Sequence, residues 1–332
     1  MKNGIIQRPA QVKGRVPFIV MIKAADYLFV IVALTAIGCR DVNVDLVGPE
    51  EQRAINEIRE LGGQVDTDAL GPNGPGVSAH FCQTGPSDAV LKRLKKINHL
   101  RALDLTRAEI TDAELGQIKS LTELEELDLG QTQVTDAGMD NIQALAKLRR
   151  LELWDTKVTD AGMRQLKRLT GLEELDLGQT RVTDAGMENL KALTTLKLLG
   201  LWGTRVTDAG LRHLEGLGQL ETLILNDTGV TDAGLAHLKM LKHLVALNLN
   251  LMNTKVTDAG LRDIARIKEL QWLNLGGTNI TDAGLDRLVA LHELKQVYLE
   301  ETLVTEAGVK KLRQALPKCR INCLPIDTDQ GT

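Results

Sequence analysis

The residues best suited to chemistry are six histidines, four cysteines and an aspartate that recurs in a TDAG motif. His213 and His237 stand at the same position of two successive repeats, and paired imidazoles can bind zinc. No cysteine or third histidine shares that position, so the pattern favours two solvated side chains. The TDAG aspartates could ligate calcium, but a capping role at the start of a helix accounts for every copy.

Catalytic and nucleotide-binding motifs such as GxSxG, HExxH, GxxxxGK and GxGxxG do not occur in a suitable context. The sequence therefore predicts no enzyme, no cofactor and no metal site. Cys319 and Cys323 lie four residues apart on a predicted strand, which is too extended for a disulfide between them. We expect these two and Cys82 to be small hydrophobic side chains in the core, with an intermolecular disulfide as the alternative.

A six-residue motif, VTDAGM or a close variant, occurs nine times from Ile110 onward. Its copies are 24 residues apart, except for one step of 26. Ahead of each copy, leucines alternate with polar residues, as at Leu151 and Leu153, which indicates a strand. After it, apolar residues recur every three or four positions, as at Met163 and Leu166, which indicates a helix. Each repeat is therefore predicted to be a strand, a corner and a helix that stack on their neighbours.

The motif itself is predicted to form the corner between strand and helix. Its Val or Ile points into the core, and Thr135 or Asp136 caps the helix by accepting a bond from a free backbone N–H. Ala137 and Gly138 are small, so we expect both to allow the first helical turns of adjacent coils to approach closely.

The repeat resembles the leucine-rich repeats, with their pattern LxxLxLxxN/CxL, over roughly residues 76–323. The resemblance implies an α/β fold: a right-handed solenoid or horseshoe of about ten repeats, with a parallel β-sheet on the concave side and helices on the convex side. Where the family has Asn or Cys, this chain has threonine, as at Thr132 and Thr180. We expect their hydroxyls to bond the backbone of the adjacent coil as a ladder. This variant is similar to repeats of bacterial exported proteins and, distantly, of F-box receptors.

Residues 1–38 are predicted to be a signal peptide, because basic residues precede an apolar run from Tyr27 to Gly38. Its end, Ala36-Ile37-Gly38-Cys39, resembles the lipobox of bacterial lipoproteins, which implies lipidation of Cys39. An ordinary secretory signal and an uncleaved anchor are the alternatives, and Met21 is an alternative start.

The rest of the chain divides by the same patterns. We expect a tether over residues 39–49, an N-terminal cap over 50–75, the solenoid over 76–323 and a disordered tail over 324–332. The longer repeat places two extra residues near Leu251 and Met252, either as a tolerated loop insertion or as a contact at the rim.

The concave sheet is where the repeat pattern leaves residue types free, and every tryptophan falls there. Exposed aromatic residues are frequent binding anchors, although these rings could also pack over glycines in the neighbouring coils. The face is acidic in its first half and rich in apolar and amide residues in its second. The predicted binding residues are Trp154, Trp202, Trp272, Tyr298, Asp128, Glu152, Asp176, Ile224, Asn248 and Asn274.

The predicted function is recognition. A formal net charge of −4 without basic runs argues against nucleic acid. We expect a monomeric, membrane-anchored leucine-rich-repeat module that binds a protein or peptide with a basic segment through its concave face. It would be an exported lipoprotein of a bacterial cell envelope, in the inner or the outer membrane. A structural or spacer component of the envelope is the alternative. A substrate receptor in ubiquitin ligation, implied by the F-box similarity, is disfavoured by the export signal.

Overall fold

The computed structural model describes residues 19–24, 27–32, 47–68, 76–81, 86–250 and 255–323. The chain forms two compact units, residues 1–43 and 44–332. In the first unit, β1 (Ile19–Ala24) and β2 (Tyr27–Val32) pair as an antiparallel hairpin. Cys39, Cys82, the Leu251–Met252 insertion and the tail lie outside the described residues. No helix in the described ranges has the length and hydrophobicity needed to cross a membrane.

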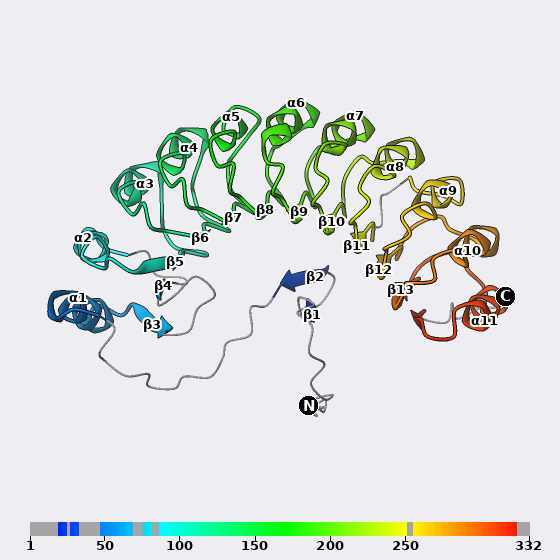
Figure 1. Ribbon diagram of the computed structural model, residues 1–332, viewed down its shortest axis with the longest axis horizontal. Helices are drawn as coiled ribbons and strands as arrows, with labels where there is room; N and C mark the ends of the chain where they lie inside the picture. Colours follow the sequence, from blue (N-terminus) through cyan, green and yellow to red (C-terminus); the bar gives the residue numbers. More distant parts are fainter. Residues whose placement is uncertain are drawn as a thin grey trace, which may run out of the picture. The chain divides into compact units, whose positions relative to one another are not determined.

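The second unit is a right-handed solenoid built on one open sheet of twelve strands, in the order β14 to β3 (Figure 1). All of its neighbouring strands are parallel except β3 and β4, which are antiparallel. The strands are β3 (Gln64–Asp68), β4 (Gly76–His80), β5 (Leu100–Asp104), β6 (Glu126–Asp128), β7 (Arg150–Glu152), β8 (Glu174–Asp176), β9 (Leu198–Gly200), β10 (Thr222–Ile224), β11 (Ala246–Asn248), β12 (Trp272–Asn274), β13 (Gln296–Tyr298) and β14 (Arg320–Asn322).

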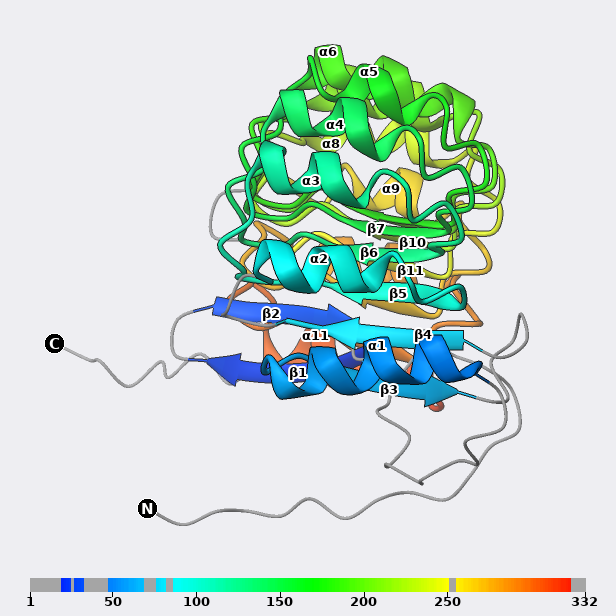
Figure 2. The ribbon, with the colours of Figure 1, turned by 90° about the vertical axis from the view of Figure 1, so that its left-hand side faces the viewer.

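Helices line the convex side of this sheet, one or two short segments to a coil (Figures 1 and 2). They are α1 (Pro49–Glu60), α2 (Asp88–Leu94), α3 (Asp112–Ile118), α4 (Asp136–Ile142), α5 (Met163–Leu166), α6 (Asp184–Met187), α7 (Asp208–Leu211), α8 (Asp232–Leu238), α9 (Leu261–Ile264), α10 (Asp282–Leu288) and α11 (Glu306–Ala315). Two 3₁₀ segments, η2 (Glu188–Ala192) and η3 (Arg212–Leu214), extend α6 and α7.

The core lies between the sheet and the helices and consists of the repeated aliphatic positions. Leu151, Leu153, Met163 and Leu166 are all fully buried, as are their equivalents in the middle coils. In a solenoid each coil contacts only the coils on either side of it, so these side chains are buried against those two neighbouring coils. The predicted solenoid, with its concave parallel sheet and convex helices, is confirmed.

The expected threonine ladder between coils is wrong. The hydroxyl of Thr180 donates to the carbonyl oxygen of Leu177 at 2.6 Å, in its own coil. The same bond to the residue three positions earlier recurs in Thr132, Thr156, Thr204, Thr228, Thr278 and Thr302. The carbonyl is close because the chain turns there at the end of the strand. These buried hydroxyls therefore close the corner of each coil and do not join one coil to the next.

The coils are joined instead by the aspartate of the TDAG motif. The carboxylate of Asp136 accepts from the backbone N–H of Thr159 at 2.7 Å and from its hydroxyl at 2.7 Å. Eight such Asp–Thr bridges run from Asp112–Thr135 to Asp282–Thr305. The threonine also caps its own helix, because its hydroxyl oxygen accepts from the N–H two residues on, as Thr135 does from Ala137.

These bridges explain the glycine of the motif. A Cβ on Gly138 would lie 2.5 Å from the carboxylate oxygen of Asp112 in the preceding coil. The prediction of close approach is therefore correct for Gly138 but wrong for Ala137, which is exposed. Glu114 stands at the glycine position in the first copy, where Thr111 bonds Glu114 and not the aspartate of the coil before.

Candidate binding surface

The side chains that flank the inner leucine of each strand lie on the concave face and form two chemically different regions. The acidic half, on β5 to β8, consists of Asp104, Glu126, Asp128, Arg150, Glu152, Glu174 and Asp176. The amide half, on β10 to β13 and the residues just after β10, consists of Ile224, Asn226, Asn248, Trp272, Asn274 and Tyr298.

The register of the parallel sheet places the acidic residues side by side. Glu152 is the partner of Asp128 on β6 and of Asp176 on β8. Arg150 is the partner of Glu126 and Glu174 on the same two strands. Neighbouring parallel strands are about 4.8 Å apart, so each carboxylate is close to others of like charge.

Arg150 is the one cationic residue among these seven side chains, and it serves several carboxylates. Its guanidinium lies 3.0 Å from Glu152, 3.6 Å from Glu174 and 3.9 Å from Glu126. Its side chain is 18% exposed, and that of Glu152 is 13% exposed. One guanidinium against six carboxylates leaves the acidic half with an excess of negative charge if all are ionised.

The excess charge and the partial burial raise several pKa values. Burial and the neighbouring charge of Asp176 raise the pKa of Glu152 to about 8. Burial also raises the pKa of Asp128, Asp176 and Glu126. At neutral pH the carboxyl of Glu152 is therefore largely protonated.

Trp202 packs into the acidic half over a glycine. A Cβ on Gly178 would overlap the indole of Trp202, and one on Gly130 would overlap that of Trp154. The Nε1–H of Trp202 donates to both carboxylate oxygens of Asp176 at 3.1 Å. The two indole centroids are 6.3 Å apart, with planes tilted by 37°. Both rings are half-buried, so packing over glycine, the alternative to a purely exposed anchor, is present in the structure.

The amide half is more buried than the sequence predicts. Trp272 is half-buried, but Ile224, Asn248, Asn274 and Tyr298 are only 5%, 2%, 0% and 7% exposed. The expectation that these four side chains are exposed is therefore wrong. Side chains on adjacent strands of a concave sheet cover one another, as Trp272 and Tyr298 do with ring centroids 5.3 Å apart.

Arg150, Glu126, Glu174 and His80 belong to this face although the sequence pattern alone did not predict them as binding residues. His80 lies 3.5 Å from Asp104 and 3.7 Å from Asp66, and its hydrogen bond to Asp104 raises its pKa. The signal was present for Arg150, which is the one basic residue in the concave columns from β5 to β13. A single arginine among several carboxylates indicates that more than one of them forms an ion pair with it.

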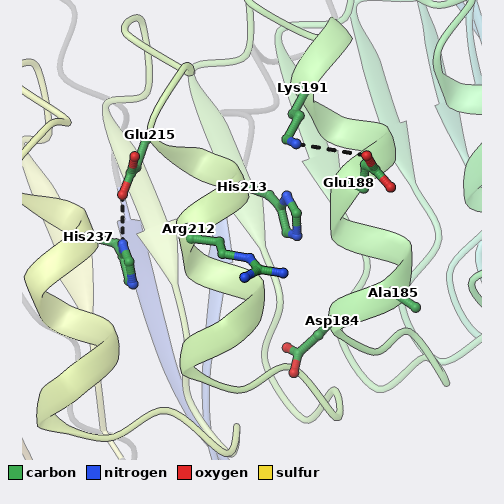
Figure 3. Close-up of a pocket in the computed structure, with 8 residues that line it drawn as sticks. All are labelled: Asp184, Ala185, Glu188, Lys191, Arg212, His213, Glu215 and His237. Atoms are coloured by element: carbon green, nitrogen blue, oxygen red, sulfur yellow. Dashed lines mark hydrogen bonds and ion pairs between the residues drawn. The ribbon is translucent and has the colours of Figure 1, made fainter.

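The convex side has a shallow pocket around the two histidines of neighbouring coils (Figure 3). His237 pairs with Glu215 at 2.6 Å, and Lys191 lies 3.9 Å from Glu188. Burial, Lys191 and Arg212 lower the pKa of His213. The described residues contain no group of three His, Cys, Asp or Glu side chains that could hold a metal ion. Cys319 is buried, Cys323 is half-buried, and both are free thiols.

Comparison with known proteins gives the same fold. The Leucine Rich repeat family matches residues 96–113, 120–142 and 169–191. No curated protein matches the chain. An internalin from Listeria monocytogenes is 21% identical, with a TM-score of 0.53 over 75% of this chain and 82% of its own. A leucine-rich-repeat protein of Leptospira interrogans is 21% identical, with a TM-score of 0.51 over 69% of this chain and 62% of its own.

A chain of the mouse RP105/MD-1 complex is 18% identical, with a TM-score of 0.55 over 69% of this chain and 39% of its own. These likenesses extend over most of the solenoid, whereas the family matches fall on three of its repeats. Together with the repeat geometry described above, they show that the chain is a leucine-rich-repeat protein.

Proposed function

We propose that the protein is a membrane-anchored recognition module whose concave face binds a protein or peptide with a basic segment. The observation that carries the proposal is the acidic half, where six carboxylates surround one arginine that pairs with three of them. Lysine or arginine side chains from a partner would supply the missing positive charge. The fold is compatible with this role, since leucine-rich-repeat proteins commonly bind protein partners and one similar chain was solved as part of a complex.

The test uses a fluorescent octalysine peptide and the purified protein. Replacing Asp128 and Asp176 with asparagine keeps the side-chain shape and removes charge from the centre of the acidic half. We expect the double variant to bind octalysine at least about tenfold more weakly at low salt, with most of the loss in the association rate. The affinity of the wild type should fall as salt is raised.

The matched control replaces Asp155 and Asp227 with asparagine. Both aspartates are exposed at coil corners, outside the strands of the concave face, and the net charge changes by the same amount as in the test variant. This control should bind octalysine within about twofold of the wild type. Equal binding by both double variants would contradict the proposed surface. Failure of any basic peptide to bind would instead favour a structural or spacer role.

Membrane attachment is proposed on the sequence around Cys39, as an exported lipoprotein of a bacterial cell envelope. Bacterial cells expressing the full chain are grown with an alkyne-labelled fatty acid. The wild-type protein should be labelled and membrane-bound, and Cys39→Ser should be neither. Cys323→Ser is the matched control and should be labelled like the wild type. Equal labelling of the wild type and Cys39→Ser, or labelling of neither, would refute lipidation at Cys39.

A further inference from the structure

Two buried amides in the amide half carry hydrogen-bond donors that lack a partner within the described part of the chain. Asn248 and Asn274 are 2% and 0% exposed, and the Nδ2 of each is buried without an acceptor among the described residues. The Oδ1 of Asn226 is likewise a buried acceptor without a donor. An unpaired buried polar group destabilises a fold, so three within one short region call for a functional explanation.

The other atom of each amide shows how the side chain is held. Asn248 Oδ1 accepts from the backbone N–H of Asn250 at 3.0 Å, and Asn274 Oδ1 accepts from that of Gly276 at 3.0 Å. In the acidic half, Asp128 holds the N–H of Gly130 at 2.8 Å in the same way. This shared bond fixes the side chain through one of its two terminal polar atoms and does not involve the other. That atom is an acceptor oxygen in the aspartates and a donor nitrogen in the asparagines.

Adjacent side chains define what can reach these donors. Asn274 is the register partner of Asn248 on β11 and of Tyr298 on β13, and Trp272 precedes it by two residues on the same face. Trp272 and Tyr298 contact each other with their ring planes tilted by 56°. Side chains change rotamer far faster than a sheet rearranges. These two rings can therefore turn outward for a ligand without a change in the backbone.

Resting on the proposed function, we propose that the amide half binds the uncharged, extended continuation of the same basic peptide, through its carbonyl oxygens. The Nδ2 groups of Asn248 and Asn274 donate to these oxygens, and Trp272 and Tyr298 pack against the peptide. From β5 to β13 the sheet has eight steps of about 4.8 Å, so a peptide of about twelve extended residues spans both halves.

A peptide fits this region better than an oligosaccharide. A sugar ring stacks on the flat face of an aromatic ring, and the tilted contact between Trp272 and Tyr298 presents no shared flat platform. The adjacent acidic half also supplies the charge that a basic peptide needs, whereas a neutral oligosaccharide makes no use of it.

The test compares two probes. One is tetralysine, and the other is a longer peptide of four lysines and eight alternating glycines and glutamines. The longer peptide is made in two forms, with the lysines at its N-terminus or at its C-terminus. Asn274→Asp keeps the Oδ1 acceptor and replaces the donor with a second acceptor. In the wild type, one order of the long peptide should bind at least tenfold more tightly than tetralysine. Asn274→Asp should lose most of this gain and leave tetralysine binding no weaker.

Asn279→Asp is the matched control, with the same change of charge at an exposed position in the corner that follows the same strand. It should keep the full gain. Asn248→Asp and Asn274→Ala serve as second variants if Asn274→Asp fails to give the wild-type circular dichroism spectrum. Each should reduce the gain of the long peptide.

The outcomes separate this inference from the proposed function. If Asn274→Asp keeps the gain while Asp128→Asn and Asp176→Asn weaken both probes, the amide half is not a peptide site and the acidic half still is. If neither probe binds the wild type, both proposals fall. If cellotetraose binds the wild type and Asn274→Asp abolishes that binding, the ligand is an oligosaccharide and the inference is overturned.

Discussion

The acidic and amide halves of the concave face share one backbone design but differ in how they satisfy their polar atoms. In both, a side-chain oxygen at the strand end accepts the N–H two residues on, as Asp176 does from Gly178 and Asn274 from Gly276. In the acidic half Glu152 pairs with Arg150, and the carboxylate of Asp176 accepts from the Nε1–H of Trp202. In the amide half the remaining nitrogens have no partner among the described residues.

The difference shows how a strictly repeated scaffold can carry a non-repeated surface. The repeat fixes the position and direction of each side chain, and a change of one atom from oxygen to nitrogen reverses its hydrogen-bonding role. One half has excess negative charge and the other has excess donors. Both are incomplete in a way that an external ligand could complete, and they would accept different parts of it.

The largest expected effect tests whether the two halves differ only at the surface. Leu151 lies beneath the acidic half and Leu273 beneath the amide half, and both are fully buried. Leu151→Ala and Leu273→Ala should each lower the free energy of unfolding by about 2–5 kcal/mol, because each opens a cavity. Denaturant titration measures both. A loss well below this range on one side only would show that the cores differ as well.

The second prediction concerns charge. Because the pKa of Glu152 is raised from 4.5 to about 8, the folded protein keeps a proton that the unfolded chain releases above pH 4.5. The contribution of the Glu152 carboxyl to the stability of the folded state is therefore complete below about pH 4.5. This contribution is lost as the pH rises to about 8, and it changes no further above that pH. Relative to the wild type, Glu152→Gln should gain stability over this window, by on the order of 1–3 kcal/mol. A constant difference between pH 5 and 8 would argue against the raised pKa.

The third prediction tests the corners, which should be alike on both sides. Asp160 bridges to Thr183 beside the acidic half, and Asp258 bridges to Thr281 beside the amide half. Asp160→Ala and Asp258→Ala should each cost about 1–3 kcal/mol in unfolding free energy, because each leaves two donors of a threonine without their acceptor. Glu306→Ala is the control and should cost much less, since the described residues give Glu306 no such bridge.

The smallest expected effect concerns the tryptophans. Trp202→Phe keeps a ring over Gly178 and removes the bond to Asp176, at a cost of about 1 kcal/mol. Trp272→Phe in the amide half should cost less, because the described residues give Trp272 no such bond to a carboxylate and its ring packs against Tyr298. Both losses are measured by denaturant titration. A larger loss for Trp272→Phe would mean that the amide half depends on its aromatic pair for stability.

Much of the fold could be predicted because the pattern of strand, corner and helix recurs every 24 residues, and each copy supports the same interpretation. Leucine alternation gave the strands and their register, and Ile321 pairs with Val297 as the period predicts. Burial on the concave face could not be read in this way. Alternation tells which face a residue such as Tyr298 occupies, but its exposure depends on neighbours one coil away.

Bonding partners were the other limit. The pattern indicates that Thr180 is buried and polar, but not that its hydroxyl reaches a carbonyl of its own coil. It also indicates that the TDAG aspartate lies near a helix start, but not that its carboxylate reaches the next coil. Both bonds depend on where a side chain ends in space, and residue type and spacing do not determine that. For the candidate site, the residue types were evident, whereas the convergence on Arg150 required the sheet.

The bridge across the longer repeat has a consequence for how this protein can vary. Asp232 holds the N–H and the hydroxyl of Thr257 at 2.8 and 2.7 Å, the same distances as elsewhere, although two more residues separate them. The bridge between these two coils therefore tolerates two more residues in the repeat. Duplication or loss of one whole coil should preserve every remaining bridge, so the solenoid can be lengthened or shortened one coil at a time. Foreign peptides grafted at residues 251–254 should likewise leave the bridge between Asp232 and Thr257 in place.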